Sequence, residues 1–120
     1  MAQYEHLPIY RQAMQLAVHL EQVVRKFSRY NKYTLGSELR EQAHGIVGNI
    51  IKANNEQGRL EALVELRDSI ERLKTTVRIA QEVKAFQTFA AFSTAVEALV
   101  SLGRQSEGWI KNVRGKQHNA

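Results

Sequence analysis

Hydrophobic residues recur at steps of three and four positions through four successive stretches of the chain. The most regular stretch lies between residues 60 and 83. Its apolar positions are Leu63, Leu66, Ile70, Leu73, Val77 and Ala80. This spacing brings the apolar side chains to one face of an α-helix, where neighbouring helices can bury them. The pattern therefore predicts an all-α fold.

The breaks in this pattern set the expected bounds of the helices. Pro8 suits the first turn of a helix, because its missing N–H would have no partner there. Thr34 or Ser37 can cap the second helix, and Gly58 lies in the turn that follows it. The expected helices span residues 8–29, 37–54, 60–83 and 87–112, followed by a basic tail over 113–120. The chain length predicts a single domain, 1–120. Because the linkers are short, we expect the antiparallel up-down-up-down topology of a four-helix bundle.

The other three helices have comparable apolar stripes. Their members are Ile9, Ala13, Leu16, Leu20, Val23 and Phe27 in the first helix, Leu39, Ala43, Ile46, Val47, Ile50 and Ile51 in the second, and Phe89, Phe92, Val96, Leu99, Gly103 and Ile110 in the last. Phe86, Phe89 and Phe92 are spaced three positions apart. Their rings could stack on bases, but burial in the core is the favoured interpretation. Gly45 and Gly48 in the middle of a helix predict a close helix approach, within the subunit or between subunits.

Composition and charge narrow the choice of function. The chain has 120 residues and no cysteine, which excludes disulfides and thiolate chemistry. The lack of cysteine makes a cytoplasmic location the simplest interpretation. No apolar run approaches the roughly 18 residues of a membrane span, so we expect no membrane among the partners. The 17 Lys and Arg exceed the 12 Asp and Glu and give a net charge of +5. The excess is concentrated in residues 25–40, with +4, and residues 104–120, with +3, which favours a polyanion or an acidic protein as partner.

The first of these blocks combines cations with tyrosines. Its cations are Arg25, Lys26, Arg29, Lys32 and Arg40, and Tyr30 and Tyr33 are interleaved with them. Lys and Arg neutralise phosphates, while Tyr can pack against bases or ribose, so the block is a candidate nucleic-acid site. The alternative is a solvated helix end, whose cations favour the C-terminal dipole of the first helix.

Two further sets of cations complete the candidate binding residues. One is Arg67, Lys74 and Arg78 on a face of the third helix, and the other is Arg104, Lys111, Arg114 and Lys116. Pairing with the nearby acidic residues Asp68, Glu71 and Glu82 is the favoured interpretation of the first set. A flexible, solubilising tail is an equal alternative for the second.

The sequence contains no recognisable catalytic or metal-binding set. Glu41 and His44 form the E-x-x-H element of di-iron bundles, but those sites need a second copy and two further carboxylates. His6, His19 and His118 have no Ser or Cys partner at a recognisable spacing, and no Gly-rich phosphate loop is present. The sequence therefore predicts a non-enzymatic protein with no catalytic residue, metal or cofactor.

Two stretches resemble those of known four-helix-bundle families. Residues 33–50 read Tyr-Thr-Leu-Gly-Ser-Glu-Leu-Arg-Glu-Gln-Ala-His-Gly-Ile-Val-Gly-Asn-Ile, which is similar to the Leu-x-Ser-x-(Leu/Ile)-Arg-x-x-Ala pattern of proteins encoded in ribosomal-RNA intervening sequences. Residues 73–86 read Leu-Lys-Thr-Thr-Val-Arg-Ile-Ala-Gln-Glu-Val-Lys-Ala-Phe, and Gly103-Arg104 and Gly108-Trp109-Ile110-Lys111 follow. This combination resembles the accessory variability determinant proteins of diversity-generating retroelements, which belong to the same superfamily.

The resemblance implies a non-enzymatic accessory protein. Such proteins are four-helix bundles that assemble as pentameric barrels and bind the retroelement's reverse transcriptase together with RNA, DNA or an RNA–DNA hybrid through a positive surface. The alternative is an interaction protein of the intervening-sequence type. Val47 and Gly48 stand where intervening-sequence proteins usually have Pro-Ser, which favours the retroelement branch. Glu107 also departs from the family pattern, and we expect it in a helix packing seam.

Overall fold

The structure is a computed structural model that describes residues 3–119, with side chains described as far as residue 117. Every regular element in this range is a helix, and the range contains no strand. The elements are a short 3-10 helix, η1 (Gln3–His6), followed by α1 (Pro8–Val24), α2 (Arg29–Lys32), α3 (Leu35–Ala53), α4 (Arg59–Glu82) and α5 (Phe89–Asn119). The predicted all-α fold class is confirmed.

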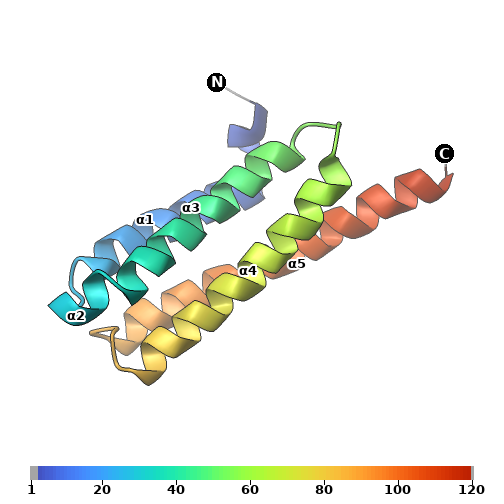
Figure 1. The fold of residues 1–120 in the computed structure, drawn as a ribbon. Coiled ribbons are helices and arrows are strands. Elements are labelled where there is room, and N and C mark those ends of the chain that lie inside the picture. Colours follow the sequence, from blue (N-terminus) through green and yellow to red (C-terminus); the bar gives the residue numbers. More distant parts are fainter. Residues whose placement is uncertain (1–2, 120) are drawn as a thin grey trace.

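The four long helices form an antiparallel bundle (Figure 1). α1 and α4 each pack against both α3 and α5, and successive long helices run in opposite directions. The molecule measures 53 × 29 × 21 Å, and the C-terminal part of α5 projects past the other helices (Figure 1). None of the described helices combines the length and the apolar character needed to cross a membrane.

The core consists of the apolar stripes that the sequence pattern predicted. In α4 the whole stripe from Leu63 to Ala80 is at most 1% exposed. The largest side chains that are completely buried are Leu20, Leu39, Ile46, Ile50, Leu63, Leu66, Ile70, Leu73, Val77, Leu99, Leu102 and Ile110. Burial of each such side chain stabilises the fold by about 1.5–3 kcal/mol, so the bundle rests on these stripes.

The first helix ends earlier than the sequence predicted. α1 stops at Val24 rather than at residue 29, and tight turns at Lys26 and Phe27 follow it. The separate helix α2 begins only after Ser28. These turns bring Phe27 into the core, where it is 4% exposed. Burial of this ring at the end of the bundle accounts for the break that the sequence pattern did not show.

Two other helix ends also differ from the expected bounds. α3 begins at Leu35, two residues before the predicted start. Thr34 precedes it, but the Thr34 hydroxyl donates a hydrogen bond to the Tyr30 carbonyl (2.9 Å) instead of capping α3. α5 continues to Asn119, so residues 113–119 are helical rather than a tail, and residue 120 lies outside the described residues.

Several predicted core positions are not buried. Phe89 is 70% exposed and Ile51 is 37% exposed, while Val23 is half-buried beside a fully buried Val24. Glu107 is also exposed, because Ser106 occupies the packing seam instead.

The predicted close approach at two mid-helix glycines is wrong within the chain. A Cβ at Gly45 or Gly48 would have no neighbouring atom within 4 Å. The close approach occurs instead at Gly36, where a Cβ would lie 2.6 Å from Val24 Cγ1. Glycine is therefore sterically required at residue 36, whereas the space beside Gly45 and Gly48 is open.

Candidate nucleic-acid interface

Two turns that are far apart in the sequence meet at the end of the bundle where α2 lies (Figure 1). The rings of Phe27 and Phe86 pack edge to face with their centroids 5.5 Å apart. The side-chain amide of Gln87 donates a hydrogen bond to the backbone carbonyl of Lys26. The turn after α1 and the turn after α4 therefore form one continuous surface.

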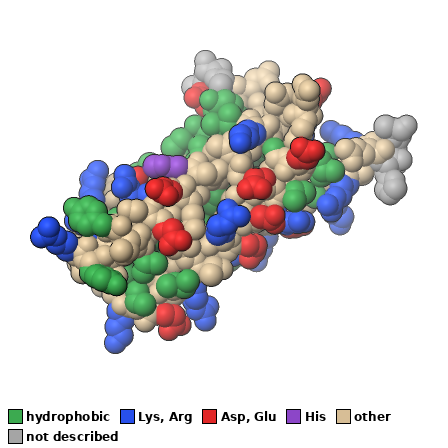
Figure 2. Space-filling model, viewed as in Figure 1, with side chains coloured by type: hydrophobic (Ala, Val, Ile, Leu, Met, Phe, Trp, Pro, Cys, Tyr) green, Lys and Arg blue, Asp and Glu red, His purple; other side chains and the backbone are tan. Residues whose placement is uncertain are grey.

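This surface is strongly positive. We call it the basic cap and define it as residues 22–37 and 83–96, which include no Asp or Glu. Its cations are Arg25, Lys26, Arg29, Lys32 and Lys84. The remaining 12 Lys and Arg equal the 12 Asp and Glu in number, so the net charge of +5 resides in the cap. In the space-filling view, Lys and Arg side chains project around hydrophobic side chains at the α2 end (Figure 2).

The backbone of the cap directs these cations towards solvent. Arg25, Lys26 and Arg29 are exposed, and Lys32 is half-buried. Lys84 has a φ of 62° and is exposed in the turn after α4. None of the five forms an ion pair with any other residue in the described part of the chain. Their charge is therefore available to an external anion.

The absence of a side chain at Gly36 allows α2 to pack closely at the end of the bundle. A Cβ at this position would lie 3.3 Å from the Asn31 carbonyl oxygen as well as 2.6 Å from Val24 Cγ1. The missing side chain lets α3 start close against the end of α1, with α2 folded back upon it. This close packing positions Arg29 and Lys32 on the cap.

Three aromatic side chains project from the cap. Tyr30 is 81% exposed, Tyr33 is 72% exposed and Phe89 is 70% exposed. Phe89 was predicted to lie in the core because it follows Phe86 by three positions. Residues 85–88 are not helical, however, so helical periodicity starts only at Phe89 and does not relate the two rings.

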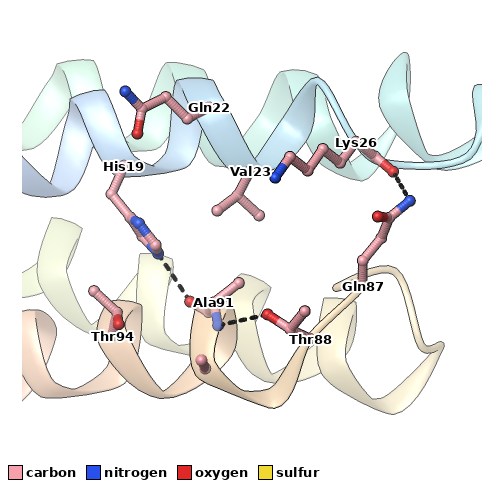
Figure 3. Close-up of a pocket in the computed structure, with 9 residues that line it drawn as sticks. His19, Gln22, Val23, Lys26, Gln87, Thr88, Ala91 and Thr94 are labelled. Atoms are coloured by element: carbon pink, nitrogen blue, oxygen red, sulfur yellow. Dashed lines mark hydrogen bonds between the residues drawn. The ribbon is translucent and has the colours of Figure 1, made fainter.

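A groove of about 310 Å³ between α1 and α5 is lined by His19 and otherwise by residues of the cap (Figure 3). Lys26 borders it from the α1 side, and Gln87 and Thr88 face it from the turn that leads into α5 (Figure 3). His19 donates a hydrogen bond from Nε2 to the Ala91 carbonyl (2.9 Å), which joins the two helices. His19 is therefore engaged in holding α1 to α5, and the groove lining contains no Ser–His or Cys–His pair of the type used in nucleophilic catalysis.

A family model described as bAvd-like matches residues 7–113. The chain belongs to the bAvd-like family. The match spans the basic cap and all four long helices except the last residues of α5. It confirms the resemblance to accessory variability determinant proteins, a family of accessory proteins that are not known as enzymes. A search of curated proteins found no match.

In this bAvd-like chain, the other predicted cations of α3 and α4 lie beside carboxylates. The pairs are Arg40 with Glu21 (2.9 Å), Arg67 with Asp68 (3.7 Å) and Glu107 (4.0 Å), Lys74 with Glu71 (3.0 Å), and Arg78 with Glu82 (3.6 Å). Hydrogen bonding from Arg40 lowers the pKa of Glu21, and the charges of Arg40 and His44 act in the same direction. These solvent-accessible pairs stabilise the fold by about 0–1 kcal/mol each, but they offset the local positive charge.

The predicted C-terminal cations of this chain lie away from the cap. Arg104 borders a groove of about 430 Å³ between α4 and α5, together with Arg67 and Lys74. Exposed positions further along α5 carry Lys111, Arg114 and Lys116. Glu71 and Glu107 line the same groove as Arg104, so its positive charge is partly balanced. The structure therefore divides the twelve predicted cations into an unpaired set at the cap, a paired set along α3 and α4, and a set spread along α5.

The E-x-x-H element does not bring its two residues together. His44 Nε2 lies 3.2 Å from Glu21 Oε1, across the α1–α3 contact, rather than beside Glu41. Across residues 3–117, no group of three or more His, Cys, Asp or Glu side chains is placed to hold a metal ion. Lys84 is not among the cations predicted from the sequence, although it lies on the cap. The absence of acidic residues over 83–96 was the available signal for it.

Proposed function

We propose that this protein is a non-enzymatic accessory variability determinant of a diversity-generating retroelement. In this role it binds RNA, DNA or an RNA–DNA hybrid through the basic cap and docks the element's reverse transcriptase during mutagenic reverse transcription. Membership of the bAvd-like family supports the accessory role. The proposal of nucleic-acid binding rests on the charge of the cap. This charge equals the entire net charge of the chain, and the cap contains no acidic residue that would offset it.

The physical basis of the proposed binding is the release of counterions from phosphates. Each cation that neutralises a phosphate displaces a condensed counterion, so affinity falls steeply as salt increases. Phosphate contacts carry little information about base sequence. The cap would therefore accept unrelated sequences.

We also propose that the protein acts as a homo-oligomer, a pentameric ring that forms through the outer face of α1 and α3. Met14 and Val18 on α1 are 38% and 49% exposed, and Ile51 on α3 is 37% exposed. Open space also lies beside Gly45 and Gly48 on α3, and Gly45 borders the groove between α3 and α4. If the ring axis is parallel to the helices, five caps of +5 lie on one rim with a formal charge of +25, and avidity strengthens weak individual contacts.

The first experiment combines the solution mass with binding to an unrelated RNA over a salt series. The cap variant carries Arg25→Gln, Lys26→Gln, Arg29→Gln and Lys32→Gln. The matched control carries Arg67→Gln, Lys74→Gln, Arg78→Gln and Arg104→Gln, and so removes the same charge from the α4–α5 surface. We expect a mass near five times the 13.7 kDa chain. We also expect the cap variant to lose affinity, while the control keeps most of it. In the cap variant, the slope of log affinity against log salt concentration should be smaller by about 0.7 for each phosphate contact removed.

Three outcomes would contradict the proposal. Equal losses in both variants would show that binding follows the net charge of the chain and is not specific to the cap. A monomer or dimer that ignores RNA would favour an intervening-sequence-type interaction protein. Failure of the wild-type protein to co-purify with the reverse transcriptase of its own element would exclude the docking role.

A further inference from the structure

The exposed aromatic side chains of this chain are all on the basic cap. Of its nine Phe, Tyr and Trp residues, Tyr30, Tyr33 and Phe89 are 70–81% exposed, and the other six are buried or half-buried. Phe27 and Phe86 are the buried aromatic residues of the cap, and their contact joins its two segments. Single exposed apolar residues are common on protein surfaces, but a cluster of aromatic rings among unpaired cations indicates a binding surface.

We infer that the basic cap binds single-stranded nucleic acid, with Tyr30, Tyr33 and Phe89 stacking on unpaired bases while the surrounding cations contact phosphates. This inference rests on the proposed function, because it specifies the nucleic acid that the cap takes. Stacking on aromatic rings is the usual way in which proteins hold unpaired bases, and it tolerates any sequence because every base has a π-face.

The shape of the cap favours a single strand over a duplex. In a duplex the bases are stacked on one another, and only their edges are accessible in the grooves. Exposed rings would then meet phosphates and sugars and gain no stacking. The only described helix that lies entirely within the cap is α2, which has four residues and is too short to lie along a major groove.

The two halves of the cap, which carry these aromatic residues, are in contact with each other. Tyr30 and Tyr33 come from the α2 region, and Phe89 comes from the start of α5. The hydrogen bond from Gln87 to the Lys26 carbonyl fixes these two segments against each other. Both segments contain cations. In the first segment, Arg29 lies between Lys26 and Tyr30 in the sequence, and the second segment contains Lys84.

The test measures binding of two RNA probes of about 12 nucleotides, a single strand of uridines and a duplex of the same length. The test variant carries Tyr30→Ala, Tyr33→Ala and Phe89→Ala. The matched control carries Ile79→Ala and Val100→Ala, which removes two exposed apolar side chains that lie outside the cap and outside the proposed subunit interface. A third variant replaces the same three aromatic residues with Trp. Circular dichroism and solution mass verify that all variants retain the fold and assembly of the wild type.

We expect the wild type to prefer the single strand. The alanine variant should lose about tenfold or more of its affinity for the single strand and less than about twofold for the duplex, because only stacking is removed. The slope of log affinity against log salt concentration should stay unchanged in the alanine variant. The Trp variant and the control should bind like the wild type.

An alanine variant that binds the single strand as tightly as the wild type would overturn the inference. Equal losses for both probes would also overturn it and assign the aromatic residues to a general contact. These results differ from failure of the proposed function, in which the wild type binds neither probe.

Discussion

Phe27 and Phe86 form an edge-to-face pair, with centroids 5.5 Å apart, at the base of the basic cap. The two rings come from different turns, and both are nearly completely buried, at 4% and 7% exposure. Their contact joins the turn after α1 to the turn after α4. The surface that we propose for nucleic-acid binding therefore depends on a core contact that lies directly beneath it.

Replacement of Phe86 with Ala should strongly destabilise the fold. Loss of a buried Phe side chain costs about 3–5 kcal/mol, because it removes apolar contacts and leaves a cavity. The matched control is Phe89→Ala, which should change the free energy of unfolding by less than about 0.5 kcal/mol, because that ring is 70% exposed. Urea denaturation at one fixed protein concentration measures both. Similar losses in the two variants would contradict the structural distinction between these rings.

Two glycine substitutions should have opposite effects. Gly36→Ala would place its Cβ 2.6 Å from the stiff, β-branched Val24 side chain, and such overpacking costs about 1–3 kcal/mol. Gly45→Ala meets no atom within 4 Å and should stabilise α3 by about 0.5–1 kcal/mol. Thermal unfolding of both variants provides the comparison. Destabilisation by Gly45→Ala that appears only in the assembled protein would show that a neighbouring subunit approaches this site.

The Glu21 carboxylate should make stability depend on pH in the acidic range. Arg40 lowers its pKa in the folded state from an ordinary value of 4.5. Glu21 therefore contributes stability above pH 4.5, and this contribution disappears as the pH falls through the lowered folded-state pKa. We expect Glu21→Gln to remove this dependence, at a cost of less than about 1 kcal/mol near neutral pH because the pair is solvent-accessible.

The control for Glu21 is the exposed Glu97, which has no ion-pair partner among the described residues. Free energies of unfolding measured from pH 7 to pH 3 should show a smaller slope for Glu21→Gln than for Glu97→Gln. Equal slopes would mean that the Arg40 contact does not affect the titration of Glu21.

Arg59 should stabilise the turn between α3 and α4 through two hydrogen bonds from its guanidinium group. Its Nε donates to the Ala53 carbonyl (2.7 Å), and its Nη2 donates to the Asn54 carbonyl (2.9 Å). Arg59→Lys keeps the charge but cannot form both bonds, so we expect a loss of about 1 kcal/mol. Arg72→Lys, at an exposed position of α4, is the matched control and should have little effect in the same denaturation experiment. A loss for Arg72→Lys as large as that for Arg59→Lys would contradict the capping role.

The sequence by itself determined the fold class and most of the core. Steps of three and four positions place the apolar residues on one face of each helix, and that relation is local, so it can be read without coordinates. The stripe from Leu63 to Ala80 is buried as predicted. The local pattern also identified Arg25, Lys26, Arg29 and Lys32 as candidate cations.

The tertiary structure alone decided where the helices break and which cations remain unpaired. The break after Val24 and the exposure of Phe89 follow from the meeting of two turns around Phe27 and Phe86. Arg40 differs from Arg25 because Glu21 on another helix lies 2.9 Å from it. These features depend on contacts between residues distant in the chain, and helical periodicity carries no information about such contacts.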